Sequence, residues 1–206
     1  GFTDRPLLSD TAYLMSKFLQ LLLGLLTAFA LSACAPAVNF KGTAIDDDSM
    51  GGNFTLTDFH GKPLGLEAFH GKVVALFFGY TNCPDVCPTT MLEYASVMKQ
   101  LGADADKVQV LFVSVDPERD TPKVLAGYVP HFDKRFIGLT GTPEQIEKVK
   151  KQYKVVAQKV PTPGGGYSVD HSAGSYLLDQ KGKLRVFQAY GTPAANLAYD
   201  IQQLLR

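Results

Sequence analysis

Hydrophobic and amphipathic stretches follow one another along this chain in the order typical of a mixed α/β fold. The uninterrupted hydrophobic run 73–78 is typical of a central strand that is buried on both faces, and residues 108–115 are predicted as the second central strand. Residues 54–58 alternate like a strand and lead into a turn at 60–63, which predicts a β-hairpin at the start of the domain. A second hairpin is predicted from residues 175–179 and 184–189, joined by a tight turn.

Helical spacing of hydrophobic residues predicts helices at 89–101, 143–153 and 196–205. The first ends at Gly102 and has Met91, Leu92, Ala95, Met98 and Leu101 as its hydrophobic positions. Thr121 and Pro122 suit the cap and first position of a short helix that runs toward Tyr128. The Gly/Pro-rich stretch 161–166 is interpreted as a flexible connection.

This order of elements predicts an α/β protein with a thioredoxin-like fold, in which helices flank a central mixed sheet. An N-terminal β-hairpin and an inserted segment are expected as additions to it. No domain boundary is apparent within residues 51–206, so we expect one domain there.

The N-terminal part of the chain has a different character. Residues 18–40 carry no charge, follow Lys17 and pass through small residues at 32–35, which is typical of a secretory signal. Residues 31–34, Leu-Ser-Ala-Cys, resemble the lipobox of bacterial lipoproteins, which predicts a lipid on Cys34 after cleavage. An uncleaved anchor helix is the alternative, since these 23 residues are long enough to span about 30 Å of hydrocarbon.

We interpret residues 1–14 as an upstream artefact, 15–33 as the signal peptide or membrane anchor, and 34–50 as a linker. Both forms of the N-terminus predict a globular part that is tethered to a membrane on the bacterial periplasmic side.

Composition excludes several classes of protein. Lys and Arg total 20, as do Asp and Glu, and 46% of the residues are hydrophobic. A net charge of zero gives no basic surface for nucleic acid, so we expect no such partner. Three cysteines are too few for a disulfide-rich scaffold.

Cys83 and Cys87 stand where a buried strand gives way to a helix. Residues at i and i+4 face each other in a helical turn, and the helix N-terminus is expected to lower a thiol pKa. The pair can therefore form a disulfide or hold a soft metal ion. A purely structural disulfide is less favoured, because so short a loop constrains the unfolded chain only weakly.

Three segments together resemble a known family. They are residues 79–88 (Gly-Tyr-Thr-Asn-Cys-Pro-Asp-Val-Cys-Pro), 116–122 (Asp-Pro-Glu-Arg-Asp-Thr-Pro) and 170–172 (Asp-His-Ser). They resemble the signature segments of the Sco/SenC family, the copper chaperones of cytochrome c oxidase assembly, and the resemblance covers about residues 50–206. It implies that Cys83, Cys87 and His171 are copper ligands.

The resemblance implies one copper ion, carried to the binuclear copper site of an oxidase subunit. Two thiolates and an imidazole favour Cu(I), although the imidazole also accepts Cu(II). Asp170 is expected either to orient the His171 ring from outside the ligand set or to cap its loop. The other histidines, His60, His70 and His131, are interpreted as ordinary polar groups, with His60 and His70 in solvated turns.

A second hypothesis makes the chain a thiol:disulfide oxidoreductase. Cys83 and Cys87 would then be a redox pair that reduces the cysteines of the oxidase copper site or of another exported copper protein. A peroxidase is less favoured, because Thr81 is separated from Cys83 by one residue and not by two. Whether the protein is an enzyme is left open between the two leading hypotheses.

Overall fold

The computed structural model describes residues 13, 15–18, 20 and 38–206. The chain divides into two compact units, Gly1–Asn39 and Phe40–Arg206. In the first unit, the described residues between 13 and 20 are helical. Cys34 and most of the expected signal segment lie outside the described residues. Among the helices that are described, none is both long and apolar enough to cross a membrane.

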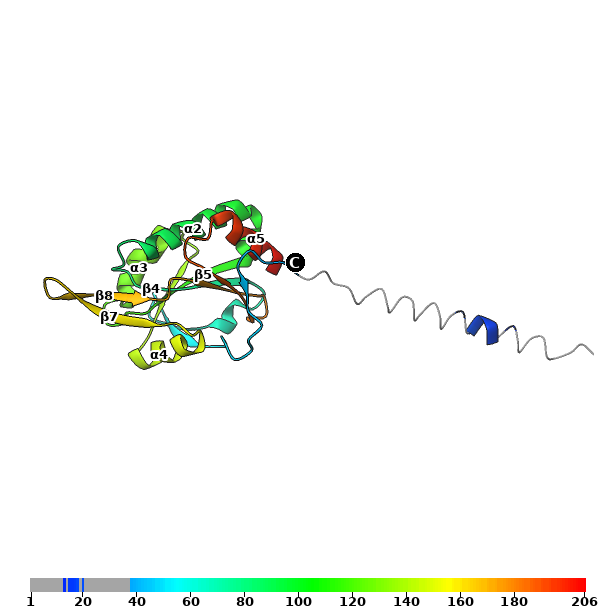
Figure 1. The fold of residues 1–206 in the computed structure, drawn as a ribbon, viewed down its shortest axis with the longest axis horizontal. Helices are drawn as coiled ribbons and strands as arrows, with labels where there is room; N and C mark the ends of the chain where they lie inside the picture. Colours follow the sequence, from blue (N-terminus) through cyan, green and yellow to red (C-terminus); the bar gives the residue numbers. More distant parts are fainter. Residues whose placement is uncertain (1–12, 14, 19, 21–37) are drawn as a thin grey trace, which may run out of the picture. The chain divides into compact units, whose positions relative to one another are not determined.

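An eight-stranded mixed sheet forms the centre of the second unit, with the strand order β1-β10-β9-β4-β5-β6-β2-β3 (Figure 1). Its strands are β1 (Thr43–Ala44), β2 (Thr55–Asp58), β3 (Pro63–Gly65), β4 (Val73–Gly79), β5 (Val108–Ser114), β6 (Ile137–Thr140), β9 (Ser175–Leu178) and β10 (Leu184–Gln188). The central strands β4 and β5 are parallel, in register from Val73 opposite Val108 to Gly79 opposite Ser114. Every residue of both strands is buried, which confirms the two central strands.

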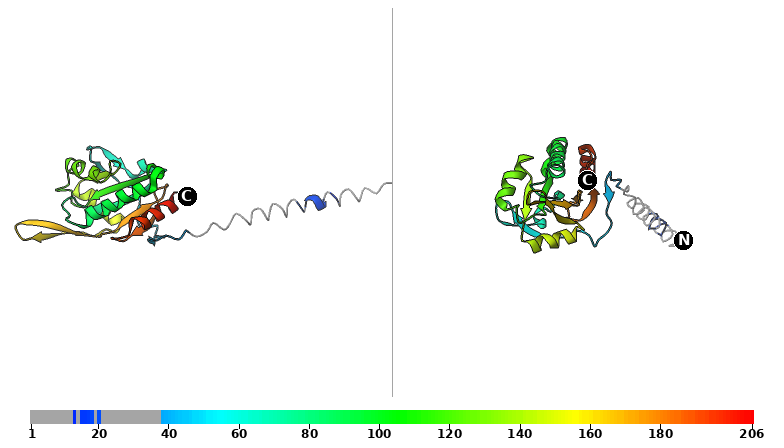
Figure 2. Two further views of the ribbon diagram at one scale, coloured as in Figure 1. Left: turned by 90° about the horizontal axis from the view of Figure 1, so that it is seen from above. Right: turned by 60° about the vertical axis from the view of Figure 1, so that its left-hand side comes forward.

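Helices cover both faces of this sheet. They are α2 (Val86–Leu101), α3 (Pro122–Tyr128), α4 (Pro143–Gln152) and α5 (Ala194–Leu204), with 3₁₀ turns at η1 (Leu66–Phe69), η2 (Gly102–Lys107) and η3 (Val129–His131). Helices α2 and α5 pack side by side on one face, and α4 lies on the other (Figure 2). The expected mixed sheet flanked by helices, with a hairpin of β2 and β3 before it, is confirmed.

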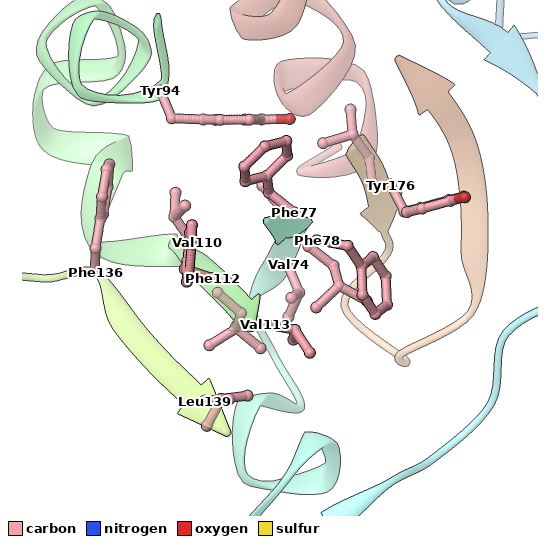
Figure 3. Close-up of a cluster of buried hydrophobic side chains, with 14 of the residues drawn as sticks. Val74, Phe77, Phe78, Tyr94, Val110, Phe112, Val113, Phe136, Leu139 and Tyr176 are labelled. Atoms are coloured by element: carbon pink, nitrogen blue, oxygen red, sulfur yellow. The ribbon is translucent and has the colours of Figure 1, made fainter. Parts of the chain in front are cut away.

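Alternation along β4 gives the core two layers (Figure 3). Phe77 points toward α2, where Tyr94 lies over it, and its ring centroid is 6.0 Å from that of Phe112. Phe78 points to the other face, 5.9 Å from the ring of Tyr176 and 5.6 Å from that of Tyr153 at the end of α4. The sheet is therefore held from both sides, and the end of β4 is fixed in place.

Several expectations about local structure were right. The hairpin of β9 and β10 is present, and Gly102 ends α2 in a positive-φ conformation. Thr121 caps α3 through its side chain, which accepts a hydrogen bond from Val124 N at 3.3 Å, and Pro122 occupies the first turn.

Other expectations about α2 were wrong. The helix begins at Val86, three residues before the predicted start, because Pro88 falls in the first turn, where no N–H bond is lost. Leu92 is 61% exposed and does not belong to the hydrophobic face of the helix.

The stretch predicted as a flexible connection is instead part of a β-hairpin. Strands β7 (Ala157–Thr162) and β8 (Gly166–His171) pair antiparallel with each other in a separate two-stranded sheet. Gly164 and Gly165 turn the chain between them with positive φ angles. This hairpin projects from the body of the domain (Figures 1 and 2). Its last residue is His171.

Candidate metal centre

The two cysteines lie where the chain leaves β4 and enters α2. Cys87, in the first turn of the helix, is completely buried, whereas Cys83 in the preceding loop is half-buried. The Cys87 N–H donates a hydrogen bond to Cys83 Sγ at 3.4 Å. Gly79 allows this packing, because a Cβ there would lie 2.9 Å from Cys87 Sγ and 2.7 Å from the Phe77 ring. With any other residue at position 79, the end of β4 could not lie this close to the buried Cys87 thiol.

His171 reaches the same point from a distant part of the chain. Its Nε2 lies 3.5 Å from Cys87 Sγ, across 84 positions of sequence. The three candidate ligand atoms all lie within 4.8 Å of one another. Within the part of the chain that the structure describes, this is the one group of three or more His, Cys, Asp or Glu residues that is arranged to hold a metal ion.

The tautomer of His171 follows from its contact with the main chain. Nδ1 lies 2.9 Å from the carbonyl oxygen of Ser172. Because a carbonyl oxygen only accepts hydrogen bonds, Nδ1 carries the proton, and Nε2 keeps its lone pair on the side of the cysteines. Such a bond at the other ring nitrogen is typical of histidines that bind metals.

Ser172 thus takes the orienting role that the sequence suggested for Asp170. The Asp170 side chain is exposed on β8, and no hydrogen bond to the His171 ring is found for it among the described residues. Its position in a strand also excludes the loop-capping alternative. What Asp170 contributes is its charge, which acts to raise the pKa of His171.

Aromatic rings enclose the imidazole. The rings of Phe77 and Tyr80 meet that of His171 edge to face, at centroid distances of 6.3 and 5.8 Å. Burial is the main influence on the His171 pKa and lowers it, outweighing the opposing effects of Ser172 and Asp170. The ring is therefore neutral at physiological pH, as a metal ligand must be.

Cys87 differs from the expectation for a thiol at a helix N-terminus. Burial raises its pKa far above the ordinary value, and the neighbouring Cys83 acts in the same direction. Loss of hydration outweighs the helix dipole here, because Cys87 itself is completely buried and its thiolate would have no contact with water. Free Cys87 is consequently a neutral thiol whose proton a metal ion must displace.

The spacing of the three atoms fits one ion. Three ligands at about 2.0–2.3 Å from a common ion lie about 3.5–4.0 Å apart in a trigonal arrangement. The observed group, with its atoms within 4.8 Å of one another, needs to contract by no more than about 1.3 Å to reach that geometry. Cys83 and His171 also line an open hollow together with Tyr80, Pro84 and Val86, so the group can be reached from solvent.

A buried polar network next to the site was not recognised in the sequence. The segment 116–122 was interpreted as a strand exit and helix cap, which it is, but its two aspartates are also buried. Asp120 accepts hydrogen bonds from Thr81, in the loop that carries Cys83, and Asp116 binds Arg119. The sequence did contain one signal for this network, which is the position of segment 116–122 directly after β5. The carboxyl ends of the parallel strands β4 and β5 meet at one edge of the sheet, so the segments that follow them lie close together.

Comparison with known proteins points to one family. A model of the SCO1/SenC family matches residues 42–206. The chain is 44% identical over 138 residues to the mitochondrial protein SCO2 of Saccharomyces cerevisiae, an alignment that covers 66% of this chain and 46% of the yeast protein. The chain thus matches about half the length of that relative.

Solved structures have the same fold. Copper-bound ScoI of Bradyrhizobium japonicum is 44% identical, with a TM-score of 0.70 over 76% of this chain and 99% of that one. BsSco, described as having a disulfide switch and as a member of the Sco family of cytochrome c oxidase assembly proteins, is 27% identical, with a TM-score of 0.62 over 79% of this chain and 98% of that one. With its family model matched over most of its length, this chain belongs to the SCO1/SenC family.

Proposed function

We propose that this protein binds one copper ion through Cys83, Cys87 and His171 and delivers it to the binuclear copper site of a cytochrome c oxidase subunit during assembly. The observation that carries the proposal is the convergence of two thiol sulfurs and an imidazole lone pair within 4.8 Å. Soft sulfur ligands favour Cu(I), and the neutral imidazole completes a three-coordinate set.

The placement of the ligands suits a cargo that must leave again. A structural zinc site normally has four protein ligands, whereas this group offers three. Cys87 lies at the buried end of the site and Cys83 at the open hollow, so an acceptor's ligand reaches the ion from the Cys83 side. Copper can then pass by stepwise exchange of ligands, with Cys83 released before Cys87.

The relatives support the same function. ScoI of Bradyrhizobium japonicum has been solved with copper bound, and BsSco is described as a member of a family of oxidase assembly proteins. We extend both properties to this chain because its cysteines and histidine meet in one place.

Anaerobic titration of the reduced full chain with Cu(I) tests the proposal. We expect one copper per chain, affinity at least tenfold lower in His171→Ala, and no binding in the Cys83→Ser/Cys87→Ser double variant. His131→Ala is the matched control, because this exposed histidine lies outside the cluster and its loss should leave binding unchanged. Full retention of copper by the double cysteine variant would refute the proposal.

A second candidate function is thiol:disulfide exchange. Neither Cys83 nor Cys87 is in a disulfide, and the 3.4 Å contact between Cys87 N and Cys83 Sγ shows how close the two residues lie. In this reaction two electrons and two protons pass from the pair to an acceptor disulfide, which leaves a disulfide between Cys83 and Cys87 and two thiols on the acceptor.

The two functions differ in their need for the histidine. We expect a strain that carries His171→Ala to lose oxidase assembly if copper delivery is essential. Normal assembly in that strain, with loss in Cys83→Ser, would favour thiol exchange. In thiol exchange, the acceptor disulfide is formed by the cysteines of the oxidase copper site or of another exported copper protein.

We further infer that the protein is held at the periplasmic face of a bacterial membrane by a lipid on Cys34. Support comes from the uncharged stretch at 18–40 and the lipobox-like residues before Cys34. Membrane fractionation of Cys34→Ser tests this, with Cys83→Ser as a matched control that should stay in the membrane fraction. Unchanged membrane association of Cys34→Ser, without cleavage, would identify an uncleaved anchor helix instead.

A further inference from the structure

The hairpin that carries His171 is not part of the main sheet. Strands β7 and β8 pair only with each other among the described strands, and they project from the domain (Figures 1 and 2). At the base of the hairpin, Ser172 N donates to Val156 O at 2.9 Å and Val156 N donates to Ser172 Oγ at 3.0 Å. These bonds close the hairpin on itself. His171 is the last residue of β8 and stands four residues before β9 of the main sheet, so side-chain contacts between the rest of the hairpin and the body add to this connection in placing it over the cysteines.

Several such contacts converge on Tyr167. The Arg119 side chain donates from Nη1 to the Tyr167 carbonyl oxygen at 2.8 Å, and its guanidinium lies 3.7 Å from the centroid of the Tyr167 ring. The Tyr167 hydroxyl donates to Asp116 Oδ1 at 2.9 Å. Arg119 Nε donates to the other carboxylate oxygen of Asp116. Tyr167 is thus held by its main chain, its ring face and its hydroxyl.

The body side of this contact is well anchored. Asp116 follows β5 and is almost completely buried, and its own N–H donates a hydrogen bond to Ser114 Oγ at 3.0 Å. Its carboxylate binds Arg119 and Tyr167 at once. Guanidinium is suited to this place, because it can hydrogen-bond in two directions while its plane stacks on an aromatic ring.

Strand geometry connects Tyr167 to the imidazole. Successive side chains alternate between the two faces of β8, so Tyr167, Val169 and His171 share one face. Val169 is only 6% exposed, which identifies this face as the one packed on the domain. Tyr167 lies about 13 Å from His171 along the strand. Contacts that fix Tyr167 therefore also hold the face of β8 that carries the His171 imidazole.

A second tie between the hairpin and the same loop is weaker. Lys159 forms an ion pair with Glu118 at 2.6 Å, but both side chains are about half exposed. Exposed pairs of this kind add little to stability. Arg119, with 27% of its side chain exposed, is the more enclosed contact.

We propose that Arg119 is a positioning residue for His171: by holding Tyr167 against Asp116 it keeps the β7–β8 hairpin closed and presents the imidazole to Cys83 and Cys87. The inference rests on the proposed copper site. Without this contact, a smaller fraction of the molecules has the hairpin packed on the domain with His171 at the cysteines. The affinity for copper falls in proportion to that fraction.

The metal-free protein gives the first test. Phe77 and Tyr80 meet the His171 ring edge to face, so the NMR shift of its Cε1 proton reports whether the hairpin is closed. We expect Arg119→Ala to move that resonance toward the value of a free imidazole. Arg135→Ala is the matched control, since Arg135 also pairs with a nearby aspartate, Asp133, away from the hairpin. An unchanged His171 resonance in Arg119→Ala would overturn the inference, whether or not copper binds.

Copper affinity gives the second test, by competition of the full chain with a Cu(I) chelator. We expect Arg119→Ala to lower affinity about tenfold in the wild-type background and to have no effect in His171→Ala. An equal loss in both backgrounds, or no loss in the wild-type background, would overturn the inference. Failure of wild-type protein to bind Cu(I) would instead overturn the proposed function, while the resonance of the metal-free protein still decides the role of Arg119.

Removing Arg119 also leaves the Asp116 carboxylate buried without its cation, so Arg119→Lys serves if the alanine variant does not fold. Lysine keeps the charge but cannot donate in two directions from a planar group. We expect the same changes in resonance and affinity, smaller in size. A folded Arg119→Lys variant could instead keep the contact with Tyr167 and give wild-type values in both measurements. That result would mean that a positive charge is sufficient, and it would overturn the role proposed for the guanidinium group.

Discussion

Asp120 shows how the fold supports the loop that carries Cys83. Its side chain is completely buried and accepts three hydrogen bonds: from Ser114 Oγ at 2.6 Å, Thr81 Oγ1 at 2.6 Å and Thr81 N at 3.1 Å. Ser114 is the last residue of β5, and Thr81 lies two residues before Cys83. One carboxylate therefore joins the end of a central strand to the metal-binding loop.

We predict that Asp120→Ala destabilises the protein by about 2–5 kcal/mol. The buried Ser114 hydroxyl loses its acceptor, which costs about 1–3 kcal/mol, and the two Thr81 donors, which water can partly reach, cost about 0.5–1 kcal/mol each. Against a typical total stability of about 5–15 kcal/mol, this is a large loss.

Asp120→Asn should cost only about 1 kcal/mol, because its amide keeps the shape and the hydroxyls of Ser114 and Thr81 can rotate to accept hydrogen bonds. Burial also raises the pKa of Asp120, which shows that the charged form is penalised in this position. Replacing the carboxylate by a neutral amide removes that penalty and offsets part of the loss.

Urea unfolding of the full chain, followed by circular dichroism, measures these differences. Asp104→Ala is the control, because Asp104 forms an exposed ion pair with Lys107 and its loss should change stability by less than about 0.5 kcal/mol. If Asp120→Ala costs less than about 1 kcal/mol, the three hydrogen bonds do not hold the loop as argued.

Three further predictions concern the thiols and the core. Since burial raises the pKa of Cys87, copper must displace its proton, so Cu(I) affinity should rise at least about tenfold per pH unit across the neutral range; a pH-independent affinity, measured by competition, would contradict this. In the reduced copper-free protein, mass spectrometry after brief treatment with iodoacetamide should find Cys83 alkylated well before Cys87, because only Cys83 is accessible; equal rates would show that the site opens. Tyr94→Phe and Ser175→Ala should each cost about 1–2 kcal/mol in urea unfolding, and the double variant clearly less than their sum, because the two buried hydroxyls bond only each other at 2.6 Å; strict additivity would refute that coupling.

The hydrophobic pattern was sufficient for the elements that lie at the centre of the molecule. Strands β4 and β5 are buried on both faces, so the sequence of β4 is a continuous hydrophobic run and that of β5 is interrupted only by Gln109 and Ser114. Thr121 before Pro122 was likewise a sufficient signal for α3, because capping is a local interaction.

Elements at the edge of the core were not predictable in this way. The β7–β8 hairpin consists mainly of exposed or half-buried residues and contains Gly and Pro, so its sequence has the character of a loop. Strand β6, Ile137–Thr140, is short and includes Gly138, which packs against Leu125 and Val129. Its place in the sheet depends on pairing with β5 and β2, which no local pattern records.

The candidate ligands themselves could be named from the sequence, because three segments resemble those of the Sco/SenC family and this resemblance implies Cys83, Cys87 and His171. Their environment was not. A helix N-terminus predicts a lowered thiol pKa, but the packing of Gly79 and Phe77 around Cys87 excludes water and reverses the sign.

The chain by itself determined which chemical groups are available and which strands form the centre of the sheet, since both follow from residue identity and local periodicity. Only the tertiary structure decided that the Ser172 carbonyl oxygen orients the imidazole, that the Cys87 thiol is buried, and that Arg119 contacts the strand that carries His171. These properties depend on distance and burial between segments far apart in sequence, and such contacts form only when the chain has folded.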